Sequence, residues 1–161
     1  RFLRAINLRD NAIGGAGGRA LASAMQGNGA LERLNVSKNR LGTAAATAIF
    51  QALPGCSGLR FLDVSSNGIH PGAAGALADG LSGHPSLRSV DLGDNQLGDA
   101  GARAVGAALG TAWPVESIRL GWNNVGPEGT VTICNKIKHL CLKKNLKTCL
   151  KFIFWWRQNP S

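Results

Sequence analysis

The chain has 161 residues, of which 44% are hydrophobic, so one domain with a buried core is expected. Residues 1–129 carry 11 Lys and Arg against 9 Asp and Glu, whereas residues 130–161 carry seven Lys and Arg and no acidic residue. The first part is therefore almost neutral and has no basic stripe, which makes nucleic-acid binding the least favoured function, and no apolar run is long enough to span a bilayer.

The first part of the chain is a sequence repeat with a period of 28 residues. Its five copies begin with an apolar residue, at Leu3, Leu31, Leu59, Leu87 and Val115. Each copy reads L-x-x-L-x-L-x-x-N-x-L, and the Asn is present in all five. Columns that agree over five copies indicate a repeat architecture. We therefore divide the chain into an array, residues 1–129, and a second segment, residues 130–161, that holds the end of the fifth helix and a basic, aromatic tail.

Each copy predicts a strand followed by a helix. The L-x-x-L-x-L part alternates apolar and polar residues, which is the period of a half-buried strand. The Gly- and Ala-rich part that follows has apolar residues at helical spacing. The predicted buried stripes are Ala20, Leu21, Ala24 and Met25 in the first copy, and Ala104, Val105, Ala108 and Leu109 in the fourth.

One such unit cannot bury its apolar face alone, so the units are expected to stack. Neighbouring strands lie about 4.8 Å apart, whereas packed helices need about 8–10 Å, and this mismatch bends the stack with the strands inside. The predicted fold is an α/β solenoid, a segment of a right-handed horseshoe, with a concave parallel sheet and convex helices.

The repeat resembles the ribonuclease-inhibitor-like class of leucine-rich repeats. The matching features are the five L-x-x-L-x-L-x-x-N-x-L blocks and the G-x-x-G-A helix start at Gly98–Ala102, seen in part at Gly126–Gly129. This class includes ribonuclease inhibitor, the recognition repeats of NOD-like receptors and the Ran GTPase-activating proteins. The resemblance covers residues 3 to about 129 and implies a horseshoe fold that acts in protein recognition, although a fold does not by itself fix a function.

The repeated Asn is expected to be structural. Where each strand ends, the chain turns and buries backbone groups that need hydrogen-bond partners. An inward-pointing amide offers a donor and an acceptor together. We expect this Asn ladder to bond the turns of successive repeats; it comprises Asn11, Asn39, Asn67, Asn95 and Asn123.

The residues between the apolar strand positions are the candidates for binding. If the column that begins at Ile6 faces the core, its alternates face the concave side. The rim of this face is formed by the residues that precede each ladder Asn: Asp10, Lys38, Ser66, Asp94 and Trp122. Aromatic and Arg side chains often dominate interface energies. The predicted partner-binding residues are Arg33, Asn35, Phe61, Asp63, Ser89, Asp91, Arg119 and Trp122.

No motif in the sequence indicates catalysis, a cofactor or a metal site. The histidines His70, His84 and His139 are scattered, and His70 and His84 precede prolines, as is typical of turns. The spacing of the four Cys fits no zinc signature, so reduced thiols in a cytoplasmic protein are expected. We therefore expect neither an enzyme nor a small-molecule substrate.

The composition changes after Gly129, and three interpretations of the following segment stay open. Residues 133–157 can be drawn as a basic amphipathic helix that would attach to an anionic membrane or to calmodulin. The same pattern suits a cap over the last repeat. The segment is also what an altered splice or reading frame would produce. Because Arg1-Phe2-Leu3 already lies inside a repeat, we expect the chain to be a fragment of a longer protein.

The predicted function is recognition of another protein through the concave face, as part of a sensor or scaffold of the NOD-like-receptor type. A module similar to the Ran GTPase activators is the alternative, and Arg40, directly after Asn39, is its one candidate edge arginine.

Overall fold

The computed structural model describes residues 3–144, which form five repeats of one strand and one helix. The short strands are β1 (Ala5–Asn7), β2 (Arg33–Asn35), β3 (Phe61–Asp63), β4 (Ser89–Asp91) and β5 (Ser117–Arg119). The helices are α1 (Gly14–Met25), α2 (Gly42–Ala52), α3 (Ala74–Leu81), α4 (Gly98–Leu109) and α5 (Pro127–Lys144). Short 3-10 helices end α2 (η1, Leu53–Gly55) and precede α3 (η2, Pro71–Ala73).

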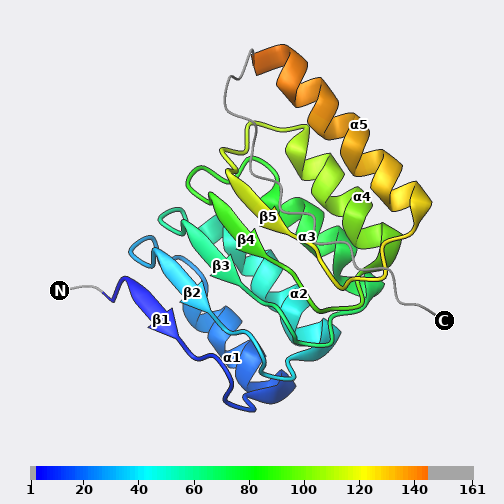
Figure 1. The fold of residues 1–161 in the computed structure, drawn as a ribbon. Coiled ribbons are helices and arrows are strands. Elements are labelled where there is room, and N and C mark those ends of the chain that lie inside the picture. Colours follow the sequence, from blue (N-terminus) through cyan, green and yellow to red (C-terminus); the bar gives the residue numbers. More distant parts are fainter. Residues whose placement is uncertain (1–2, 145–161) are drawn as a thin grey trace.

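All five strands form one parallel sheet in the order of the sequence. Each residue pairs with the one 28 positions later, as Ile6 pairs with Leu34 and Leu62 with Val90. The repeat period is therefore the register of the sheet. Figure 1 shows the helices as a second layer along one side of the strands. The predicted α/β solenoid is confirmed.

The core lies between these two layers. Leu34, Leu62 and Val90 point from the strands into it and are at most 1% exposed. From the helical side, Ile49, Phe50 and Leu77 are fully buried, as are most residues of the remaining apolar columns. Burial of each such side chain contributes about 1.5–3 kcal/mol, so the interior repeats supply most of the folding free energy.

The first repeat is less buried than the sequence columns predict. Ile6 and Leu8 are only partly buried, and Leu3 is 65% exposed, because no strand or helix among residues 3–144 covers this end. The predicted stripe on α4 is correct in all its residues. The stripe on α1 is partly wrong: Ala20 and Ala24 are exposed, and Ala22 is buried together with Met25.

Glycine permits the turn into three of the helices. Gly14, Gly42 and Gly98 have φ values of 67°, 70° and 57°, a backbone region that glycine enters without steric cost. Each donates its N–H to the carbonyl oxygen of a ladder Asn in the next repeat, at 2.8–3.0 Å. His70 holds this place in the third repeat and donates its N–H instead to Thr43 Oγ1 at 3.0 Å; there η2 precedes the α-helix.

Within residues 3–144 the structure contains no helix that is long and apolar enough to cross a membrane. Helix α5 extends beyond Gly129 to Lys144, as expected for the end of the fifth helix. The rest of the segment drawn as an amphipathic helix, residues 145–157, lies outside the described residues, so its three interpretations stay predictions.

Candidate functional site: the concave face

The ladder asparagines bond backbone groups of two repeats at once. The Asn67 amide nitrogen Nδ2 donates to the carbonyl oxygens of Val64 and Ser65 in its own turn and of Val36 in the preceding repeat, each at 3.0 Å. Its oxygen Oδ1 accepts the N–H groups of Asn39 and Leu41, at 2.9 and 3.3 Å. The same pattern recurs at the other interior positions, and the four ladder residues from Asn39 to Asn123 are at most 6% exposed. These side chains are inaccessible to a partner.

The middle strand column also forms turns. Oδ1 of Asn35 accepts the N–H of Ser37 at 3.0 Å, and Oδ1 of Asp91 accepts the N–H of Gly93 at 2.9 Å. Asp63 bonds both the N–H and the hydroxyl of Ser65, at 3.0 and 2.7 Å, and is only 6% exposed. The Asp63 carboxylate is therefore buried in its own turn, and its predicted role in partner binding stays a prediction.

The exposed candidates lie on either side of this column. Arg33 is exposed, and its guanidinium carbon lies 4.8 Å from the ring centre of the half-buried Phe61, at cation–π distance. Arg119 occupies the middle column of the fifth repeat, where it cannot accept a turn hydrogen bond. Its Nη1 donates instead to Asp91 Oδ2 at 3.2 Å. Ser89 is half-buried on β4.

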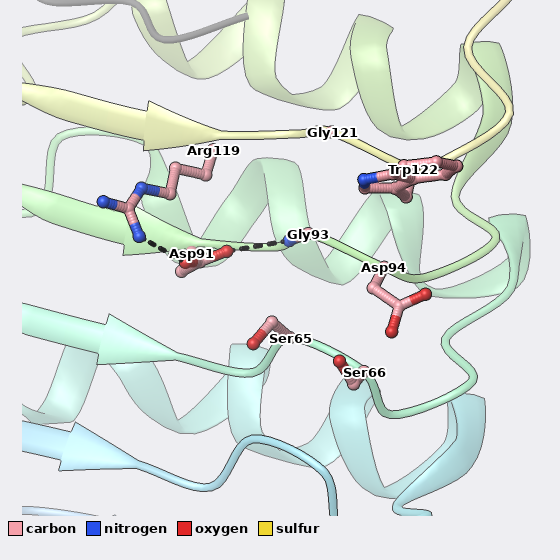
Figure 2. A pocket seen from close by; sticks show the side chains of 8 residues that line it. All are labelled: Ser65, Ser66, Asp91, Gly93, Asp94, Arg119, Gly121 and Trp122. Atoms are coloured by element: carbon pink, nitrogen blue, oxygen red, sulfur yellow. Dashed lines mark hydrogen bonds and ion pairs between the residues drawn. The ribbon is translucent and has the colours of Figure 1, made fainter. Parts of the chain in front are cut away.

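A pocket of about 440 Å³ opens at the carboxyl ends of β3, β4 and β5 (Figure 2). It contains two of the predicted residues on its strand side, Asp91 and Arg119, and a third, Trp122, on its rim. The other lining residues come from the turns that follow the strands: Ser65, Ser66, Gly93, Asp94 and Gly121. Gly93 and Gly121 line the pocket with backbone atoms alone.

The rim of the face has an unusual backbone conformation. All five residues that precede a ladder Asn have left-handed φ values, between 53° at Asp94 and 61° at Asp10 and Trp122. Asp adopts this region with little strain, whereas a bulky side chain such as Trp is a genuine outlier there. Trp122 is nevertheless 55% exposed, so burial of its ring does not offset the strain. Strain of this kind is often retained at binding sites.

Comparison with known families identifies the repeat. The sequence model of the leucine-rich repeat matches residues 1–22, 55–78, 83–106 and 114–134, which together are 91 of the 161 residues. The chain belongs to the leucine-rich repeat family. No curated protein matches the chain significantly.

Leucine-rich repeats generally mediate protein–protein interactions, and the family is typically non-enzymatic. The second copy in this leucine-rich repeat array, in which no match covers residues 31–54, still pairs in register through β2 and carries Asn39 in the ladder. Its helix α2 is also packed as in the other repeats, with Ile49 and Phe50 fully buried. The array is therefore continuous from the first repeat to the fifth.

The described part of this leucine-rich repeat protein holds no group of three or more His, Cys, Asp or Glu placed to bind a metal ion. His84 is 2% exposed, and its Nδ1 accepts the N–H groups of Ser86 and Leu87 at 3.3 and 3.1 Å. Burial lowers the pKa of His84, and burial raises the pKa of the Cys56 thiol. Arg40, directly after Asn39, is exposed and has a φ of 54°. None of His84, Cys56 and Arg40 lines the pocket described above.

Sequence reasoning placed the concave columns but missed how the turn residues combine. Asp94 and Ser66 belong to the predicted rim, yet the pocket that they form with Asp91 and Trp122 depends on the left-handed turns and on Gly93. Asn and Asp recur in the middle strand column, and their side chains often accept a hydrogen bond from the backbone two residues further along the chain. This recurrence was the signal in the sequence that could have predicted the turns.

Proposed function

We propose that this leucine-rich repeat array recognises another protein through the concave face of its sheet, as part of a larger cytoplasmic sensor or scaffold of the NOD-like-receptor type. The 28-residue period and the G-x-x-G-A helix start support assignment to the ribonuclease-inhibitor-like class. The partner is a protein, and neither a substrate nor a cofactor is involved.

The observation that carries this proposal is the exposure of Trp122 at a strained position beside a pocket. An aromatic ring that is 55% exposed and held at φ 61° contributes little to folding. Aromatic and Arg residues are the types that dominate binding energies at interfaces. Arg33 and Arg119 are exposed on the same sheet, which is rigid because each strand is bonded to its neighbours.

The proposal is tested with two variants of the full chain. The first changes the concave face through Phe61→Ala, Arg119→Ala and Trp122→Ala. The second is a matched control on exposed helical positions, with Arg19→Ala, Arg103→Ala and Val131→Ala. Both should keep the native circular dichroism spectrum, because none of the six side chains is fully buried.

The wild-type chain and both variants would be immobilised and exposed to cell extract. A bound protein that is lost by the concave variant and kept by the helical control supports recognition through the sheet. If the concave variant retains every protein bound by the wild type, the concave face is not the recognition surface.

A further inference from the structure

The pocket at the carboxyl ends of β3, β4 and β5 combines an aromatic ring, two carboxylates, one guanidinium and two hydroxyl groups. Figure 2 shows Trp122, Asp94 and Ser66 on three adjacent turns, with the pair of Arg119 and Asp91 at the strand side. All three turn residues precede a ladder Asn, so the same backbone conformation presents them at one edge of the sheet. Their arrangement is thus fixed by the repeat.

The charges that line the pocket leave one carboxylate without a partner. Asp91 is occupied, since it accepts the N–H of Gly93 and the guanidinium of Arg119. Asp94 is exposed, and its carboxylate has no hydrogen bond or ion pair with any residue between 3 and 144. The lining therefore has two carboxylates and one guanidinium, a formal charge of −1. A cation is favoured here and an anion is disfavoured.

The aromatic side of the pocket favours the same kind of ligand. The faces of an indole ring attract cations, and Trp is the best of the aromatic residues in this respect. The concave face already contains one such contact, because the guanidinium of Arg33 lies 4.8 Å from the centre of the Phe61 ring. No Arg or Lys from residues 3–144 is stacked in this way on Trp122. Its exposed ring is available to a cation from outside the chain.

We infer that this pocket receives an arginine side chain of the protein partner, with the guanidinium group stacked on Trp122 and hydrogen-bonded to the Asp94 carboxylate. Arginine fits better than lysine, because its planar group stacks on a ring while its N–H donors reach a carboxylate and the hydroxyls of Ser65 and Ser66. Arg119 stays paired with Asp91 and forms the strand-side wall. The inference rests on the proposed function, since it names the chemistry of the partner at that surface.

The test uses the full chain with ¹⁵N-labelled tryptophan, observed through its indole N–H resonances. The Trp122 signal is assigned by its disappearance in Trp122→Asn, a variant expected to fold because Asn tolerates left-handed φ. The probe is N-acetyl-arginine methylamide. The matched ligand is N-acetyl-citrulline methylamide, which has nearly the same shape and no charge, and N-acetyl-lysine methylamide is the third probe.

We expect the arginine probe to shift the Trp122 signal in a saturable way, and the citrulline probe to bind about tenfold more weakly, as expected for loss of a charge-assisted hydrogen bond. Asp94→Asn should weaken arginine binding by a similar factor. Asp10→Asn is the matched control, since Asp10 is an exposed carboxylate in the same rim column with φ 61°, outside the pocket. This control should bind as the wild type does.

Equal binding of the arginine and citrulline probes, stronger binding of the lysine probe, or no effect of Asp94→Asn would overturn the inference. The outcome is separable from that of the proposed function. If partner capture depends on the concave face while the pocket shows no preference for arginine, recognition through the sheet stands and the inference fails. If the pocket prefers arginine while partner capture survives the concave substitutions, the pocket chemistry is as inferred and the proposed function fails.

Discussion

Asn67 joins the turns of two successive repeats through one side chain, and its loss affects several buried groups together. In Asn67→Ala the N–H groups of Asn39 and Leu41 lose their acceptor, and the carbonyl of Val36 loses a donor. A buried polar group without a partner costs about 1–3 kcal/mol, so we expect a loss of about 3–5 kcal/mol in the free energy of unfolding. Urea denaturation followed by circular dichroism measures it.

Asn11→Ala is the control for this ladder substitution. Asn11 is exposed, and its Nδ2 donates only to Leu8 and Arg9 of its own turn. No N–H among residues 3–144 donates to its Oδ1. We expect a loss of about 1 kcal/mol. Equal losses at the two positions would contradict the role of the ladder between repeats.

Trp122 is expected to lower the free energy of unfolding, because its backbone is strained and its ring is largely exposed. Replacement by Asn relieves the strain of a bulky residue at φ 61° and loses little burial. We predict that Trp122→Asn raises the free energy of unfolding by about 1 kcal/mol, toward the low end of the cost of such strain. Thermal unfolding measures the change. A lower melting temperature would show that the ring supports the fold and is not held for binding.

The buried imidazole of His84 makes stability depend on pH. Burial lowers its pKa in the folded state below the ordinary value of 6.5, so below that value the unfolded chain binds the proton more readily. The contribution of neutral His84 is complete above pH 6.5 and is lost progressively as the pH falls below 6.5 toward the lower pKa of the folded state. Protonation of Nδ1 would also displace the N–H groups of Ser86 and Leu87. We predict that, as the pH falls below 6.5, the melting temperature falls more steeply for the wild type than for His84→Asn.

His84→Asn is a suitable control because Asn28 occupies the same place in the first repeat. Oδ1 of Asn28 accepts the N–H groups of Ala30 and Leu31 at 3.1 and 3.2 Å, as His84 does for its own turn. The variant therefore keeps an acceptor and loses the titrating group. Parallel pH profiles of the two proteins would rule out this role for His84.

At the scale of elements, glycine sets how closely neighbouring helices approach. A Cβ atom on Gly80 of α3 would clash with the backbone carbonyl oxygen of Phe50 in α2, which cannot move without shifting that helix. A Cβ on Gly75 of the same helix would meet nothing within 4 Å. The two positions share a helix and differ in packing.

We predict that Gly80→Ala lowers the free energy of unfolding by about 1–3 kcal/mol, the usual cost of overpacking. Gly75→Ala should raise it by about 0.4–1 kcal/mol, since Ala loses less conformational freedom in a helix. Comparing the thermal unfolding of the two variants measures the effect of the close contact between α2 and α3. A stabilising Gly80→Ala would show that α2 and α3 can separate without cost.

The helical packing was predictable only in part. Ala104, Val105, Ala108 and Leu109 follow the α4 stripe that the sequence predicts, because large residues mark the buried face. In α1 the face is marked by Gly18 and Ala22, and small residues occur on both sides of that helix. Hydrophobic spacing does not distinguish a buried Ala from an exposed one, so Ala20 and Ala24 were misplaced.

For the whole molecule, the 28-residue period was enough to predict the sheet, its parallel order and its register, because each strand repeats the phase of the one before. The pocket was not predictable in this way. It depends on φ angles in the turns and on Gly93 and Gly121, whose missing side chains carry no hydrophobic signal. The burial of Asp63 likewise depends on its own turn and not on the alternation of the strand.

Protection of backbone amides against hydrogen exchange should increase from the first repeat to the central repeats. Leu8 donates its N–H to Asn35 at a sheet edge where the apolar side chains are only partly buried. Val64 donates to Asp91 between strands that are paired on both sides. Local opening costs less where few apolar groups are buried, so we predict faster hydrogen exchange at Leu8 than at Val64. Equal exchange would mean that the whole array opens as one unit.

The element pairs in extensive contact belong to the same repeat or to adjacent repeats, and the register never departs from 28 residues. The recognition surface can therefore lengthen or shorten by one repeat at a time. Duplication or loss of 28 residues adds or removes one strand and one helix. The remaining strands and helices then still pack against equivalent neighbours. A change of any other length breaks the 28-residue spacing only in the repeat where it falls, whose strand, turn and helix must then fit between unchanged neighbours. Whole repeats are therefore the changes of length that this fold accepts with least distortion.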